Sequence, residues 1–156
     1  TSLRQNYKDG KKDGLSEDFH EDGLWDLFNR DGTLSLRQNY KDGKLDGLWE
    51  QFSDGGTLRS RKNYKDGKLD GLWENFSHGG TLEFRVNYKD GKLDGLWELF
   101  DRDGTLSLRQ NYKDGKLNGL EESFRHDVTL YEDGTPESVE CYQNGELVDM
   151  SFCEEK

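Results

Sequence analysis

The chain has 156 residues, of which 30% are hydrophobic, 12% aromatic and 35% charged, and its formal net charge is −11. This length fits one domain or one short repeat array, and the low apolar content excludes a membrane-spanning helix and argues against a conventional layered core. Residues 1–38, 39–110 and 111–156 carry charges of −2, −1 and −8. No segment is basic, so we expect no binding to nucleic acid or to anionic membranes.

A sequence block recurs along the chain. Asn-Tyr-Lys-Asp-Gly-Lys begins at residues 6, 39, 63, 87 and 111, at intervals of 33, 24, 24 and 24 residues. A fixed period in this range is typical of stacked supersecondary units. We therefore predict one array over 1–156. It has irregular N-terminal units (1–38), three regular repeats (39–110) and a last repeat with an acidic C-terminal cap (111–156), which ends in a degraded copy at 141–147.

Each regular unit predicts two strands and two turns. In residues 68–91, we expect strands over 68–76 and 81–89, a turn at Ser77–Gly80 and a two-residue turn at Asp90–Gly91. Asp-Gly between such runs favours a type I′ turn, in which both central residues have positive φ. The predicted fold class is therefore all-β, with tandem 24-residue β-hairpins forming an elongated up-and-down antiparallel sheet. The sequence leaves open whether this sheet is flat, coiled or closed.

The register follows from opposite charges. With Gly55–Gly56 as the centre of the longer turn, Glu50 lies opposite Arg61, and the same rule pairs an acid with an arginine in every regular unit. A four-residue turn would place Arg59 there instead, and that pairing fails in the next unit. The predicted pairs are Asp26–Arg37, Glu50–Arg61, Glu74–Arg85 and Glu98–Arg109. Each exposed pair contributes about 0.2–1 kcal/mol, so the pairs specify register more than stability.

Aromatic side chains also recur in phase. The tryptophans are Trp25, Trp49, Trp73 and Trp97. We interpret these rings as the core of the sheet, because the chain offers little else to bury. Gly47 and Gly71 lie inside the first strand of a unit, where they leave room for a neighbouring ring or for a bend.

No residue pattern predicts catalysis, a cofactor or a metal. His20, His78 and His126 are out of phase with the repeat and lack a second His or Cys at ligand spacing. The Asp101–Gly104 turn lacks the bidentate Glu of a calcium loop. A carboxylate paired with arginine is held ionised, which suits a structural role better than proton transfer. We therefore expect a non-enzymatic protein with no cofactor.

Two cysteines, Cys141 and Cys153, lie in the C-terminal cap. Their spacing allows a local disulfide, but it allows two free thiols equally well. No pattern typical of a secretory signal is present. We favour free thiols and a cytoplasmic location.

The run from Asn63 to Trp73, which reads Asn-Tyr-Lys-Asp-Gly-Lys-Leu-Asp-Gly-Leu-Trp, resembles the bacterial variant of the MORN repeat. The shared pattern is an Asn-Gly or Asp-Gly turn, Lys, Leu, a second Gly and then aromatics, and it covers about residues 3–150. The resemblance implies an array of β-hairpins used as a scaffold, often for protein partners. The family includes proteins described as antitoxin components, so it also suggests that role.

Candidate binding residues are found where the regular units differ. Under the predicted register these positions form direct cross-strand pairs, in a stripe that becomes more apolar toward residue 108. They are Gln51, Ser60, Asn75, Phe84, Leu99 and Leu108. We interpret the stripe as a surface for another protein or for self-association. The alternatives are an aromatic-row module for a glycan or choline, and a designed or purely structural repeat protein without a partner.

Overall fold

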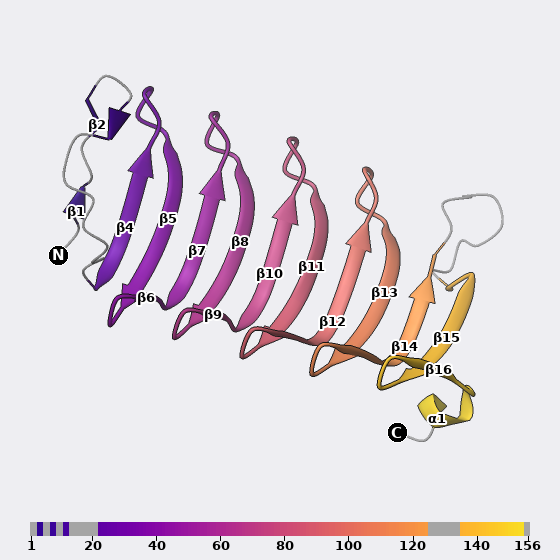
Figure 1. The fold of residues 1–156 in the computed structure, drawn as a ribbon. Coiled ribbons are helices and arrows are strands. Elements are labelled where there is room, and N and C mark those ends of the chain that lie inside the picture. Colours follow the sequence, from indigo (N-terminus) through magenta and orange to yellow (C-terminus); the bar gives the residue numbers. More distant parts are fainter. Residues whose placement is uncertain (1–2, 5–6, 9–10, 13–21, 125–134, 155–156) are drawn as a thin grey trace.

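The computed structural model describes residues 3–4, 7–8, 11–12, 22–124 and 135–154. Its strands lie side by side in one elongated, open, single-layered sheet (Figure 1). Over these described residues the sheet has 14 strands, and β2 (Tyr7–Lys8) and β3 (Lys11–Lys12) form a separate pair. The strands of the sheet are β1 (Leu3–Arg4), β4 (Gly23–Phe28), β5 (Leu34–Lys41), β6 (Lys44–Leu45), β7 (Gly47–Phe52), β8 (Leu58–Lys65), β9 (Lys68–Leu69), β10 (Gly71–Phe76), β11 (Leu82–Lys89), β12 (Lys92–Phe100), β13 (Leu106–Lys113), β14 (Lys116–Ser123), β15 (Ser138–Gln143) and β16 (Glu146–Val148).

Neighbouring strands from β4 to β16 pair in antiparallel fashion, which confirms the predicted all-β hairpin array. The sheet is open rather than closed (Figure 1). Strand β1 departs from the prediction of hairpins only, because it pairs in parallel with β4. A parallel neighbour needs a longer connection than a hairpin turn, and here that connection contains β2 and β3.

The Asp-Gly turns have the predicted type I′ geometry. Asp66 and Gly67 have φ angles of 49° and 80°. The equivalent turns with two positive φ angles are Asp42–Gly43, Asp90–Gly91, Asp114–Gly115 and Asn144–Gly145. Asp and Asn are the non-glycine residues that tolerate this region best. The turns also stack along one edge of the sheet, because the Gly67 amide donates to the Leu45 carbonyl of the preceding unit at 2.8 Å.

The longer turns have three central residues rather than the two that we predicted. The Ser53 amide donates to the Thr57 carbonyl at 2.8 Å, and the Gly56 amide donates to the Ser53 carbonyl at 2.8 Å. Gly56 has a φ of 77°. This arrangement is a type I turn followed by a left-handed residue, a common three-residue hairpin loop.

A β-bulge restores the register that the longer turn would otherwise shift. Phe52 pairs with Leu58 next to the turn, yet Glu50 pairs with Arg61. One additional residue, Arg59, is therefore accommodated in β8, as bulges allow. The extra turn residue and the bulge cancel, so the predicted register is confirmed although the predicted turn was wrong.

The first strand of each unit bends at its internal glycine. Gly71 has a φ of 107°, and the predicted strand 68–76 is split there into β9 and β10. A Cβ at Gly71 would lie 3.3 Å from the Cβ of Asn63, and the Asn63 side-chain amide donates to the Leu72 carbonyl at 2.8 Å. We call this contact the Asn clamp. It recurs as Asn39–Leu48, Asn87–Leu96 and Asn111–Leu120.

The C-terminal unit is closed by a short helix, α1 (Ser151–Glu154), that contacts β15. Cys141 of β15 and Cys153 of α1 form a disulfide with a Cα–Cα distance of 6.1 Å. The prediction of two free thiols was therefore wrong, since sequence spacing alone does not show whether two Cα atoms approach within bonding range. Within the described part of the chain, no helix is long and apolar enough to cross a membrane.

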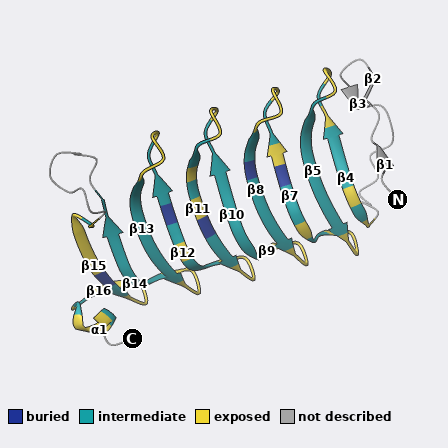
Figure 2. Ribbon diagram, turned by 180° about the vertical axis from the view of Figure 1, so that it is seen from behind, coloured by how far each residue is buried: buried dark blue, intermediate teal, exposed yellow. Residues whose placement is uncertain are grey.

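Burial in the described residues is modest and scattered over several strands (Figure 2). The residues classed as buried are Val86, Cys141, Glu50, Ser60 and Glu98. Most other side chains in the strands are half-buried, as expected for one layer with two open faces. Glutamates are among the most buried groups, so they need partners within the sheet.

Candidate interaction face

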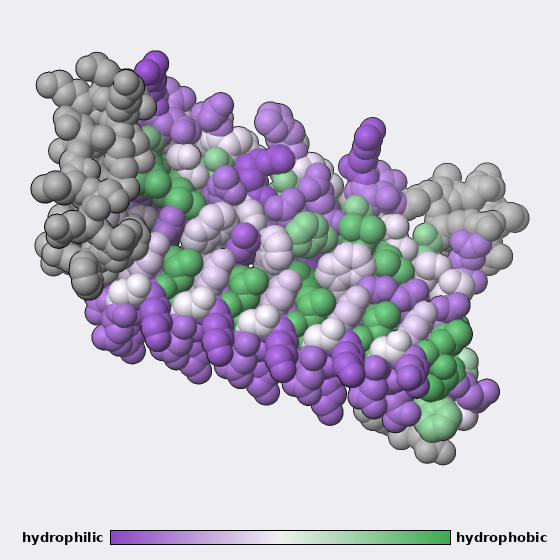
Figure 3. Space-filling view, in the orientation of Figure 1, coloured by the Kyte–Doolittle hydropathy of each residue, from purple (hydrophilic) through white to green (hydrophobic). Residues whose placement is uncertain are grey.

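Successive residues of a strand point to opposite faces, so the register sorts side chains into rows across the sheet. We call the face with the four tryptophans the aromatic face and the opposite face, with the paired acids and arginines, the ionic face. Apolar side chains recur in a regular row next to the hydrophilic edge that the turns form (Figure 3).

The six variable residues form one continuous row on the aromatic face, which we call the outer row. Each is the direct cross-strand partner of the next, in the order Gln51, Ser60, Asn75, Phe84, Leu99 and Leu108. The row is polar over β7, β8 and β10 and apolar over β11, β12 and β13. The structure therefore brings all six together as the register predicted, and their role in binding stays a prediction.

A second row lies next to the outer row and contains the tryptophans. One residue of each intervening strand separates successive rings, namely Gln38, Lys62 and Val86. The Lys62 Nζ lies 4.5 Å from the centroid of Trp49 and 4.6 Å from that of Trp73. Burial lowers the pKa of Lys62. An ammonium group of the protein itself thus fills the slot between these two rings, in the geometry of a cation–π contact.

Trp73 joins the two rows. Its indole Nε1 donates to the Ser60 hydroxyl at 3.1 Å. Its ring contacts Phe84 edge-on with centroids 5.2 Å apart, and it lies 6.1 Å from the ring of Tyr88. These contacts support the interpretation of the rings as packing groups and fix Phe84 beside the tryptophan row.

A cavity of about 330 Å³ lies beside the apolar end of the outer row. Phe84 and Leu99 line it, together with the two neighbouring turns through Ser77 and Arg102. This volume accommodates one large side chain, so the apolar end offers a recess as well as a surface.

The tryptophan row ends in two acids. Glu121 occupies the position that Trp97 has in the preceding unit, and its cross-strand partner is Glu140. The Gln110 side-chain amide donates to Glu121, and the Tyr142 hydroxyl donates to Glu140 at 2.8 Å. In the described part of the chain, no lysine or arginine forms an ion pair with either carboxylate.

The ionic face carries a ladder of alternating charge. Its members are successive cross-strand partners: Asp26, Arg37, Glu50, Arg61, Glu74, Arg85, Glu98, Arg109 and Glu122. The predicted pairs lie opposite each other, but contacts also join different units. Arg61 lies 3.2 Å from Glu50 and 3.7 Å from Glu74, and Arg85 pairs with Glu98 of the next unit. These inter-unit contacts were not predicted, although the alternation of acid and arginine continues onto the next strand and indicates them.

Glu98 is the most enclosed carboxylate of this ladder, with a side chain only 4% exposed. Its burial would raise its pKa, but the hydrogen bonds and charges of Arg85 and Arg109 outweigh that effect and lower the pKa. The group is therefore held as a carboxylate, which fits a structural role rather than proton transfer.

The remaining sequence candidates have local explanations or lie outside the described residues. His78 is exposed in the turn between β10 and β11, and His20 and His126 lie outside the described residues. The Asp101–Gly104 turn is closed by its own backbone, because the Gly104 amide donates to the Asp101 carbonyl at 2.9 Å. Over the described ranges, no group of three or more His, Cys, Asp or Glu side chains is placed to hold a metal.

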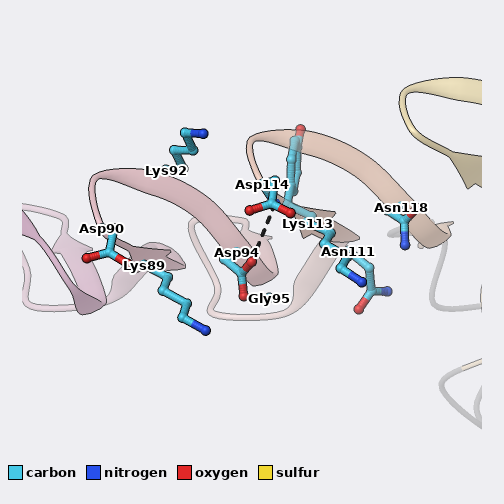
Figure 4. Close-up of a pocket in the computed structure, with 10 residues that line it drawn as sticks. Lys89, Asp90, Lys92, Asp94, Gly95, Asn111, Lys113, Asp114 and Asn118 are labelled. Atoms are coloured by element: carbon cyan, nitrogen blue, oxygen red, sulfur yellow. Dashed lines mark hydrogen bonds between the residues drawn. The ribbon is translucent and has the colours of Figure 1, made fainter.

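A hollow of about 510 Å³ lies at the edge formed by the Asp-Gly turns (Figure 4). Lys89, Lys92 and Lys113 line it together with aspartates of the same turns. The Asp94 carboxylate faces the Asp114 backbone amide at 3.4 Å and thereby joins two consecutive units. The aspartates thus have a structural contact here, and most of the residues that line this hollow are charged or polar.

The model of the MORN repeat variant matches the chain three times, at residues 45–66, 69–90 and 93–114. Residues 45–114 therefore belong to the MORN repeat variant family. Each match covers one hairpin of the structure, namely β7–β8, β10–β11 and, except for Lys92, β12–β13. The family repeat and the structural unit coincide, which makes this part of the chain a MORN repeat scaffold.

No curated protein matches the chain. Among solved structures, it is similar to a mutant of S. aureus TarM in complex with fondaparinux, alpha-GlcNAc-glycerol and UDP (14% identity, TM-score 0.39, 62% of this chain and 19% of that chain). It is also similar to another structure of TarM (14%, 0.37, 61% and 20%) and to accessory secretory protein 1, 2 and 3 of Streptococcus pneumoniae (15%, 0.38, 67% and 19%). The chain spans about a fifth of the length of these structures.

Proposed function

We propose that this MORN array is a non-enzymatic scaffold that binds another protein through the outer row of its aromatic face. The observation that carries the proposal is the contrast between constant and variable positions. The Asp-Gly turns, the Asn clamps and the charge ladder repeat almost unchanged from unit to unit, whereas the outer row changes from polar to apolar along one continuous line. The fold itself requires the constant positions. Binding to a partner would explain why the polarity of the outer row changes along the sheet.

The absence of enzymatic activity is part of this proposal. It is supported by the state of the acids on the ionic face, which pair with arginines, and by the lowered pKa of Glu98. An antitoxin role, as the family resemblance suggests, would be one case of binding another protein and needs no catalytic residue of this chain.

One specific observation favours a second candidate, a module for a sugar or a quaternary ammonium ligand. The ammonium of Lys62 lies between Trp49 and Trp73, so rings at this spacing accommodate a cation. Titration with a saccharide series and with choline tests this candidate, because stacking on the rings would quench tryptophan fluorescence. Unchanged fluorescence at high ligand concentration would remove it.

Capture of a partner by matched variants tests the main proposal. Leu108→Ser, alone and with Phe84→Ser, should lower the amount of each specifically captured protein by about tenfold, because interface contacts of this kind are worth about 1–2 kcal/mol. Circular dichroism should retain the β signal.

Leu96→Ser supplies the matched control. Leu96 is 39% exposed and lies on the ionic face, so its loss should leave capture unchanged. Equal capture by the wild type and the Leu108→Ser variant would overturn the proposed surface. Loss of capture only in the Leu96→Ser variant would move the surface to the ionic face.

A further inference from the structure

The apolar end of the outer row has the features of an anchoring site. Phe84, Leu99 and Leu108 are adjacent across three strands, and all three are half-buried. The cavity of about 330 Å³ beside Phe84 and Leu99 is open to one further side chain. A few side chains, aromatic ones above all, supply most of the affinity of many interfaces when they fill well-packed pockets.

An uncompensated pair of negative charges lies on the same face, close to this anchoring site. Glu121 and Glu140 are direct cross-strand partners, and like charges in such positions disfavour the sheet. Glu140 is exposed. The Tyr142 pKa is raised, first by its hydrogen bond to Glu140 and then by burial and the charges of Glu121 and Glu140. The C-terminal unit thus places a repulsive pair where regular units continue the row with a ring.

We infer that the partner binds through an apolar anchor followed or preceded by lysine or arginine. This inference rests on the proposed function and specifies its partner. The anchor occupies the recess beside Phe84 and Leu99, and the basic residues lie on Glu121 and Glu140. The acids lie two and three strands beyond β12, or about 10–14 Å across the sheet, and two residues, or about 7 Å, away from the outer row along the strands. The resulting separation of about 12–16 Å is spanned by about four to five residues of an extended peptide.

Charge complementarity distinguishes this partner from the other classes. The negative pair repels phosphate groups, so a nucleic acid or an anionic lipid is disfavoured on this surface. A second copy of the chain carries the same acids and a net charge of −11, so it would bring like charges together. A basic and apolar peptide removes the repulsion between Glu121 and Glu140.

The probes are three synthetic peptides with blocked ends. The first has Leu-Phe, a Gly-Ser-Gly spacer and Lys-Arg; the second replaces Lys-Arg by Glu-Glu; the third replaces Leu-Phe by Ser-Ser. Each is titrated against the full chain with ¹⁵N-labelled tryptophan, and the indole signals are followed. We expect the first peptide to bind at least about fivefold more tightly than either control, because the two exposed ion pairs and the apolar anchor each add a modest amount of binding free energy. The Trp97 signal should shift and the Trp25 signal should not.

Charge variants of the protein complete the test. Glu121→Gln with Glu140→Gln should weaken the first peptide by about three- to tenfold and should reduce the salt dependence of its binding. Glu146→Gln is the matched control, since Glu146 is an exposed acid of β16 outside this pair. If the double variant binds the first peptide as well as the wild type does, the inferred basic partner is wrong.

The outcomes separate this inference from the function on which it rests. Equal binding of the Lys-Arg and Glu-Glu peptides, with both weakened by Leu108→Ser, retains the outer row as a binding surface and overturns the basic partner. Binding of no peptide also overturns the inference, whereas the capture experiment with Leu108→Ser decides the proposed function independently.

Discussion

The regular units and the C-terminal unit hold the segment that follows their second strand by different contacts. In a regular unit, Asn63 donates a side-chain hydrogen bond to the Leu72 carbonyl at 2.8 Å and thereby holds the strand of the next unit. In the C-terminal unit, Cys141 occupies the equivalent position of the repeated block, and it bonds covalently to Cys153 of α1. A hydrogen-bonded clamp continues the array, whereas the disulfide closes it with a helix.

This difference shows what an open repeat sheet needs at its end. A hydrogen-bonded clamp requires a following strand that offers a carbonyl, and among the described residues no further strand pairs beyond β16. Cys141 is 2% exposed and lies on β15, next to β16, the edge strand of the described sheet. Such an edge invites pairing with other chains, and α1 contacts the strand beside it.

The largest expected effect comes from breaking the covalent clamp. Cys153→Ser should destabilise the C-terminal unit by about 3 kcal/mol, because the disulfide closes a loop of a dozen residues. Units in such an array contact only their neighbours, so the effect should stay local. Hydrogen exchange should accelerate in β15, β16 and α1 and remain slow in β10 and β11. Uniform acceleration over all strands would contradict a local role, and chemical reduction of the wild type should reproduce the variant.

A smaller effect is expected from the hydrogen-bonded clamp of a regular unit. Gly95→Ala should destabilise the chain by about 2 kcal/mol, since Gly95 has a φ of 107° and its new Cβ would lie 3.2 Å from the Asn87 Cβ. Gly115→Ala is the control, with a φ of 85° but no atom within 4 Å. It should cost about 1 kcal/mol. Urea unfolding compares the two variants, and equal losses would show that the contact with Asn87 is unimportant.

Substitutions in the charge ladder should have the smallest effect on stability, and this effect should differ between the regular units and the C-terminal unit. Glu98 contacts two arginines, whereas Glu122 contacts Arg109 at 3.5 Å and then faces Val139. At neutral pH, Glu98→Gln should cost about 1–2 kcal/mol and Glu122→Gln less than about 1 kcal/mol.

The pH dependence of Glu98 follows from its lowered pKa. Its stabilising contribution is fully present above the ordinary value of 4.5 and is lost as the pH falls through the lower pKa of the folded state. Unfolding curves measured from pH 7 downward should therefore fall more steeply below about pH 4.5 in the wild type than in the Glu98→Gln variant. Identical slopes would show that Glu98 ionisation does not contribute to stability.

The sequence by itself determined the repeat, the hairpins, the type I′ turns and the rows of the sheet. These features depend on local backbone preference and on alternation, and both can be read from neighbouring residues. The pairing of Glu50 with Arg61 was predicted correctly because a shift of one residue would have moved whole rows to the other face. The six residues of the outer row were found for the same reason.

Only the tertiary structure decided the bulge at Arg59, the Asn clamp and the disulfide between Cys141 and Cys153. Each depends on how close atoms of different strands come, and a linear pattern does not contain that distance. The bulge shows this clearly, because two one-residue deviations cancel and leave the same register as a shorter turn. The recess beside Phe84 and the paired acids at Glu121 and Glu140 likewise arise where separate units meet. Sequence periodicity thus determines which residues share a row, and contacts between units determine which recesses and charge pairs those rows form.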